Sequence, residues 1–182
     1  MGIVYKIAIG ISIHQNISTR EKMIDMGMFT LHRFNGIEQF TIAEAKVYVV
    51  ENDDKSITLW LEMETDEQPL HSVPDTADCG MNPSGEITIY LDHLQLGTFG
   101  ERTFTIPNGY DEKSKSLIAG LYYFEHQEVN DNTLHLAYKG NGVFQARWTG
   151  VTTDIAYYDG SKLDTKIEVT GAFFFEDYKD WQ

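Results

Sequence analysis

Cysteine and basic residues are scarce in this chain, and each scarcity excludes a class of protein. The single cysteine, Cys79, has no partner for an intramolecular disulfide, so no disulfide framework holds the fold. Lysine and arginine number 14 against 28 acidic residues, which gives a net charge of −14. This charge excludes nucleic acid as a partner, because Lys and Arg supply the affinity for phosphates. It also excludes docking on an anionic membrane surface.

Long hydrophobic runs are also missing. No apolar stretch approaches the roughly 18 residues that a membrane-spanning helix needs. The apolar stretch 1–13 contains Lys6 in its middle, and no small-x-small cleavage site follows it, so it does not have the form of a signal peptide. The sequence therefore predicts a soluble, cytoplasmic protein.

Apolar residues are nevertheless plentiful. Hydrophobic residues make up 42% of the 182 positions and aromatic residues 13%, which is enough for a packed core and argues against disorder. The chain has no repeat and no linker rich in Gly, Ser or Pro. We predict a single all-β domain over residues 1–182, since all-β domains often reach about 200 residues.

Alternation of apolar and polar residues predicts that most of the chain is β-strand. Within 3–13, isoleucines and Tyr5 fall on one face, and small residues with Lys6 fall on the other. From Phe29 onward, turn residues recur about every 8–12 positions, as in sandwiches and barrels. We predict an antiparallel β-sandwich of jelly-roll-like topology, with a closed β-barrel as the alternative. The predicted strands cover residues 41–51, 56–65, 86–96, 102–107, 117–129, 133–139, 143–151, 153–158 and 165–176.

One short helix is predicted near residues 18–26. Ser18 and Glu21 have the spacing of a capping box, and Gly27 would end the helix. The alternative is a loop with a single helical turn.

The first of the listed strands can be paired with the second. Placing Val49 opposite Leu59 joins the two apolar faces through a short loop at Asp53 and Asp54. The same register puts Tyr48 opposite Trp60 and a lysine opposite a glutamate on the outer face. A slip of one residue would set apolar against polar faces, so the pattern defines its own register.

A second hairpin is predicted at Asn130 and Asp131, which are typical turn residues. It would place His126 opposite His135, with Glu128 on the same face. Two imidazoles and a carboxylate can hold zinc, so these three residues are the candidate metal site. The alternative is a solvated outer face that carries two histidines.

Acidic residues gather between positions 51 and 92, where eleven carboxylates face a single lysine. Calcium takes 6–8 oxygen ligands, which separate loops of a β-sandwich can supply. The alternative is ordinary turn chemistry, since Asp side chains cap the local backbone. We predict no cofactor, with calcium and zinc as alternatives. The candidate binding carboxylates are Asp53, Asp54, Asp66, Asp75 and Asp78.

Three hypotheses for function follow from these observations. The first is a non-enzymatic binding or interaction module that presents the acidic segment 51–92, with Tyr48 and Trp60, to a protein or saccharide partner. The second is a small hydrolase or isomerase that uses carboxylates or the histidine pair in a sheet cleft. The third is a homo-oligomeric structural protein. The carboxylates of the second hypothesis are Glu44, Glu62 and Glu64.

Overall fold

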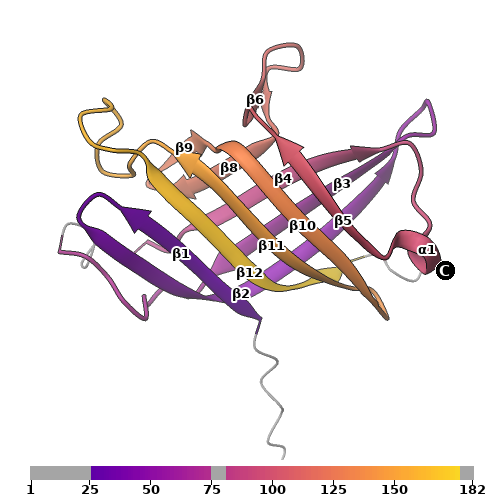
Figure 1. The fold of residues 1–182 in the computed structure, drawn as a ribbon, viewed down its shortest axis with the longest axis horizontal. Helices are drawn as coiled ribbons and strands as arrows, with labels where there is room; N and C mark the ends of the chain where they lie inside the picture. Colours follow the sequence, from indigo (N-terminus) through magenta and orange to yellow (C-terminus); the bar gives the residue numbers. More distant parts are fainter. Residues whose placement is uncertain (1–25, 75–80, 177–182) are drawn as a thin grey trace, which may run out of the picture.

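One large antiparallel sheet dominates the computed structural model, which describes residues 26–74 and 81–176. Its strand order is β5-β10-β11-β12-β1-β2-β3-β4-β8-β9 (Figure 1). The strands of this sheet are β1 (Gly27–Arg33), β2 (Gly36–Glu51), β3 (Ile57–Thr65), β4 (Ser84–Leu91), β5 (Glu101–Ile106), β8 (Ala119–Tyr123), β9 (Glu125–Glu128), β10 (Asn130–Gly140), β11 (Val143–Thr152) and β12 (Thr165–Phe175). The short elements outside it are α1 (Leu96–Phe99), β6 (Tyr110–Asp111) and β7 (Ser116–Leu117).

The predicted all-β, antiparallel fold is confirmed. The described strands do not close into a barrel, because β5 and β9 form the two edges of the sheet. The jelly-roll topology is not confirmed, since one continuous sheet supplies both layers. The predicted strand at 153–158 is a succession of turns, whereas β1 and α1 were not predicted. The alternating stretch 3–13 and the predicted helix up to residue 25 lie outside the described residues.

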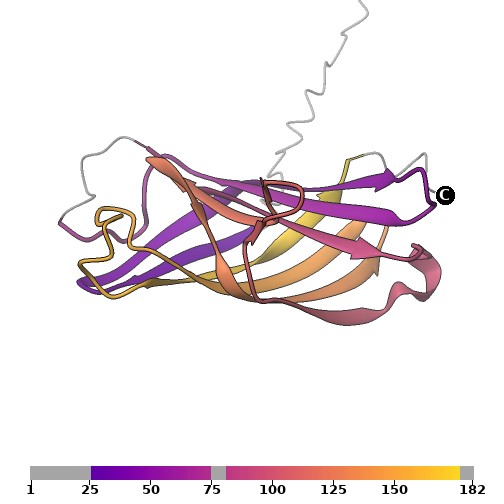
Figure 2. The same cartoon turned by 90° about the horizontal axis from the view of Figure 1, so that it is seen from above.

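The sheet bends over so that its two halves enclose the core. Figure 2 shows β2 and β3 on one side of the molecule and β10, β11 and β5 on the other. The halves meet in the interior, where a Cβ atom built on Gly85 of β4 would lie 3.2 Å from the Trp148 ring of β11. Trp148, Leu134 and Leu61 are each at most 2% exposed. The inward positions of the strands therefore form one hydrophobic core.

The predicted register of β2 and β3 is confirmed. Val49 lies opposite Leu59, and Tyr48 lies opposite Trp60. Leu59 is fully buried while Trp60 is 38% exposed, so the alternation in sequence does divide the core face from the outer face.

The predicted hairpin at Asn130 and Asp131 is wrong. β9 pairs with β8, which places His126 opposite Tyr122. β10 pairs with β5 and β11, which places His135 opposite Thr103 and Arg147. The chain crosses from one half of the sheet to the other between β9 and β10 and does not fold back.

The crossing is held by buried groups around Val129. Val129 is fully buried, and its N–H donates to the carbonyl of Ala119. The buried Asn132 amide donates to the Val129 carbonyl and accepts a 2.8 Å hydrogen bond from the Trp148 indole. A reversal at this point would expose Val129 and leave the Asn132 amide without these bonds, which is costly for a buried polar group.

A buried ionic network ties β1, β2 and the segment after β11 together. Arg33 donates to Glu38 at 2.9 Å and, through two nitrogens, to Asp154 at 2.7 and 2.9 Å. All three side chains are fully buried. Asp154 also accepts hydrogen bonds from the Thr165 hydroxyl and the Ala156 N–H.

Burial and hydrogen bonding act in opposite directions on this network. Burial alone would raise the pKa of Asp154, but its bonds from Arg33, Ala156 and Thr165 hold that pKa below its usual value. Burial likewise works to lower the pKa of Arg33, and the two carboxylates raise it above the ordinary value. Both ends of the pair therefore stay charged inside the fold.

Candidate functional site

The outer side of β2, β3, β4, β8 and β9 carries a continuous two-row array of polar and aromatic side chains. Cross-strand pairing sets one row as Lys46, Glu62, Glu86, Gly120 and Glu128. The next row is Glu44, Glu64, Ser84, Tyr122 and His126. Together with the neighbouring pair Tyr48 and Trp60, these twelve positions are named the acidic face.

The core determines which residues reach this face. Successive side chains of a strand point to opposite sides of the sheet. In β3 the buried residues Leu61 and Met63 alternate with Glu62 and Glu64, and in β4 the buried Ile87 follows Glu86. Burial of the apolar positions therefore fixes the carboxylates on the outside.

Charge on the acidic face is unbalanced. Five glutamates meet one lysine at its positions, and Lys46 forms an ion pair with Glu44 at 2.7 Å. Glu62 lies between Lys46 and Glu86 in its row. Partial burial first, and then the charges of Glu64 and Glu86, raise the pKa of Glu62 above its ordinary value. A cation placed against Glu62 would relieve this repulsion.

Aromatic rings flank the carboxylates at both ends of the array. The Tyr48 and Trp60 rings lie 5.2 Å apart, and the Tyr122 and His126 rings lie 4.7 Å apart in an edge-to-face arrangement. Trp60 and Tyr122 are each 38% exposed. Partial burial, followed by the charge of Glu62, raises the pKa of the Tyr48 hydroxyl, which keeps it neutral at physiological pH.

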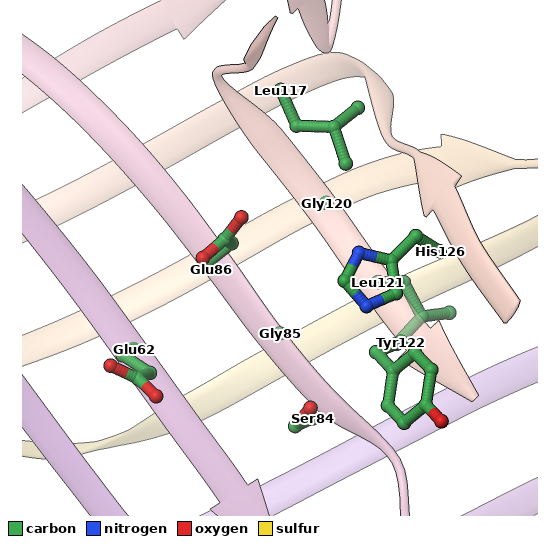
Figure 3. Close-up of a pocket in the computed structure, with 9 residues that line it drawn as sticks. All are labelled: Glu62, Ser84, Gly85, Glu86, Leu117, Gly120, Leu121, Tyr122 and His126. Carbon is green, nitrogen blue, oxygen red and sulfur yellow. The ribbon is translucent and has the colours of Figure 1, made fainter. Parts of the chain in front are cut away.

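A groove of about 200 Å³ is cut into the acidic face between β3 and β9 (Figure 3). Glu62 and Glu86 border it from one side, and Tyr122 and His126 border it from the other (Figure 3). Gly85 and Gly120 lie between them without side chains, so the backbone of β4 and β8 contributes to the groove lining. A smaller depression of about 110 Å³ over Glu44, Tyr48 and Glu64 shares Glu62 with the groove.

The described residues among the predicted binding residues lie in three separate places. Tyr48 and Trp60 lie together on the acidic face. Asp53 and Asp54 lie in the turn between β2 and β3, and Asp66 follows the far end of β3, roughly 30 Å away along the strand. Asp54 accepts hydrogen bonds from the Ser56 hydroxyl and N–H, which lower its pKa. Asp54 thus acts as a turn residue. Asp75 and Asp78 lie outside the described residues.

The predicted zinc cluster of His126, Glu128 and His135 is not formed. It depended on the predicted hairpin at Asn130 and Asp131, which the structure does not contain. His126 and Glu128 are on β9 at one edge of the sheet, whereas His135 is on β10, where its Nδ1 lies 2.8 Å from the Thr103 hydroxyl. Within residues 26–74 and 81–176, no group of three or more His, Cys, Asp or Glu side chains is placed to hold a metal ion. The described residues therefore give no geometry for either zinc or calcium.

Sequence reasoning missed four residues that complete the site: Ser84, Glu86, Gly120 and Tyr122. The β4–β8 pairing that assembles them joins residues more than 30 positions apart. Alternation in 84–91 does assign Glu86 to an outer face. No local signal indicates that β8 lies beside β4, so the groove could not be read from the sequence.

Comparison with family models, with curated proteins and with solved structures found no match to this chain. No helix in the described part of the chain is long and apolar enough to cross a membrane. The acidic face itself is therefore the feature from which a function can be inferred.

Proposed function

We propose that this protein is a non-catalytic binding module whose acidic face takes a basic segment of a partner protein. One observation carries the proposal: five glutamates share the face with a single lysine and with exposed Tyr and Trp rings. Carboxylates attract ammonium and guanidinium groups, and aromatic faces add cation–π attraction of about 0.5–1 kcal/mol at exposed sites.

A basic protein segment fits this face better than a neutral saccharide does. Sugars also stack on aromatic rings, and Trp60 with Tyr48 would serve that purpose. A neutral sugar leaves the repulsion around Glu62 in place, whereas a cationic side chain removes it. The carboxylates of Glu64 and Glu86 beside Glu62 therefore favour the cationic partner.

The hydrolase or isomerase alternative uses the same carboxylates less well. Glu44, Glu62 and Glu64 lie on the outer side of the sheet, and the depression that they share has a volume of about 110 Å³. Glycoside hydrolysis needs two carboxylates on either side of a bond held in a cleft, and a closed site excludes competing water. An open outer face supplies recognition more readily than it supplies such a cleft.

A decapeptide of alternating arginine and glycine is the probe that tests the proposal. We expect saturable binding in isothermal titration calorimetry, weakening as salt is raised because exposed charges are screened. The E62Q/E86Q double variant should weaken binding roughly fivefold, since each exposed ion pair contributes about 0.2–1 kcal/mol. The matched control is E112Q/D164N, which removes two exposed carboxylates outside the acidic face.

Three outcomes would refute the proposal. They are no binding of the peptide at low salt, equal weakening by E62Q/E86Q and by the control, and equal affinity for a peptide in which citrulline replaces arginine. Citrulline keeps the shape of arginine and removes its charge. Equal affinity for it would show that charge does not drive recognition.

A further inference from the structure

We infer that the groove beside Gly120 accepts one arginine side chain of the partner, so that Gly120 determines specificity on the acidic face. This inference rests on the proposed function and adds a defined position to it. Gly120 stands in the row between Glu86 and Glu128, where every other residue has a side chain. Gly120 is buried, and the Leu117 side chain, which also lines the groove, packs against it.

The fold does not require a glycine at position 120. The backbone of Gly120 is not in the positive-φ region, which is where glycine has a conformational advantage. A Cβ there would meet the Leu117 side chain at 3.2 Å, with Glu86 and the Gln127 carbonyl at 3.7 Å. The end of a leucine side chain can yield by a few tenths of an ångström. A side chain at position 120 would thus displace Leu117, which lines the groove, so Gly120 acts through the room that it leaves for Leu117 and not through backbone geometry.

The chemistry around the groove matches a guanidinium group. Glu62 and Glu86 are direct neighbours on β3 and β4, so their carboxylates lie on the same side of the groove. The planar guanidinium carries five donors that match carboxylates, and it stacks on aromatic rings. Tyr122 and His126 supply rings on the opposite side, and Ser84 supplies a hydroxyl. An ammonium group has no plane to stack, so we expect arginine to bind better than lysine.

This inference is tested with variants of Gly120 in the full chain. The probes are N-acetyl-arginine amide, N-acetyl-lysine amide and N-acetyl-citrulline amide. In NMR titrations the arginine probe should shift the signals of Tyr122 and His126, and the citrulline probe should not. G120V should abolish these shifts, and G120A should weaken binding of the arginine probe less than G120V does. T88V, which places valine elsewhere on the outer side of β4, is the matched control and should leave the shifts unchanged.

The outcomes separate this inference from the proposed function. Suppose that the arginine–glycine decapeptide binds and that its binding depends on Glu62 and Glu86. If G120V then binds both the decapeptide and the arginine probe as tightly as the natural chain does, the groove assignment is wrong and the proposed function stands. Equal binding of the lysine and arginine probes would also overturn the assignment. If the decapeptide does not bind at all, the proposed function fails first. Thermal unfolding of G120A and G120V, compared with T88V, verifies that each variant is folded.

Discussion

Two groups of carboxylates in this molecule have opposite surroundings. Glu38 and Asp154 lie in the interior and share Arg33, with every acceptor–donor distance between 2.7 and 2.9 Å. The glutamates of the acidic face lie on the outside and share Lys46 alone among its twelve positions. The pKa of Asp154 is lowered, whereas the pKa of Glu62 is raised.

The difference indicates what each group contributes. A buried charge must be compensated within the fold, because desolvation without a partner costs several kcal/mol. A charge on the surface is tolerated without a partner, because water solvates it. The interior network therefore serves folding, and the uncompensated charge of the acidic face is available to another molecule.

Removing Asp154 should have the largest effect on stability. D154N removes the carboxylate that Arg33 binds through two of its nitrogens, and it leaves the carboxylate of Glu38 in place. We expect a loss of about 3 kcal/mol in the free energy of unfolding, measured by urea denaturation. D159N, in an exposed turn of the same segment, should cost less than about 1 kcal/mol. Similar losses in the two variants would contradict the distinction between buried and exposed carboxylates.

Two glycines that line the groove should differ in what an added side chain costs. Gly85 faces inward, and a Cβ there would lie 3.0 Å from the Met63 methyl and 3.2 Å from the Trp148 ring. We expect G85A to cost about 1–3 kcal/mol through overpacking. Gly120 is also buried, but the nearest atom to a Cβ there is the end of the Leu117 side chain, which can move, so G120A should cost less than G85A. The two unfolding curves settle the comparison, which fails if G120A is the more damaging variant.

Acid should act on the two regions with opposite signs. Asp154 has a lowered folded-state pKa, so its stabilising contribution is complete above its unfolded pKa and is lost as pH falls through the folded value. The natural chain should lose stability below about pH 4 more steeply than D154N does. Urea denaturation between neutral pH and pH 3 measures both slopes. Parallel slopes would mean that Asp154 is not stabilised by Arg33.

Glu62 should show the smallest effect. Its folded-state pKa is raised, so its charged form destabilises the fold above that pKa, and the cost disappears as pH falls through it. E62Q should therefore stabilise the protein at pH 7 by roughly 0.5 kcal/mol or less. The gain should vanish in acid and shrink at high salt. A loss of stability at pH 7 would show that Glu62 makes favourable contacts within the chain.

The sequence predicted the β2–β3 pairing residue by residue for a physical reason. Leu59 and Val47 must both reach the core, which excludes a slip of one residue, and the short turn between the strands disfavours larger slips. Tyr48 and Trp60 then follow on the outside. This half of the candidate site could be predicted because the two strands are joined by a short turn.

The rest of the fold depends on contacts between distant residues. Asn130 and Asp131 have the composition of a turn, yet Val129 and Asn132 are buried at a crossing between the two halves of the sheet. The Arg33–Asp154 contact joins positions 121 residues apart. Polar residues such as His126 and His135 gave no pattern that could reveal which strands they face.

The most direct test of the central claim is a map of backbone amide shifts during titration with the arginine–glycine decapeptide. We expect the shifts to concentrate in β2, β3, β4, β8 and β9, where the acidic face lies. They should be absent around Arg33 and Asp154, whose side chains are fully buried. Shifts spread evenly over the molecule, or confined to the strands β10, β11 and β12, would contradict the claim that the acidic face is the binding surface.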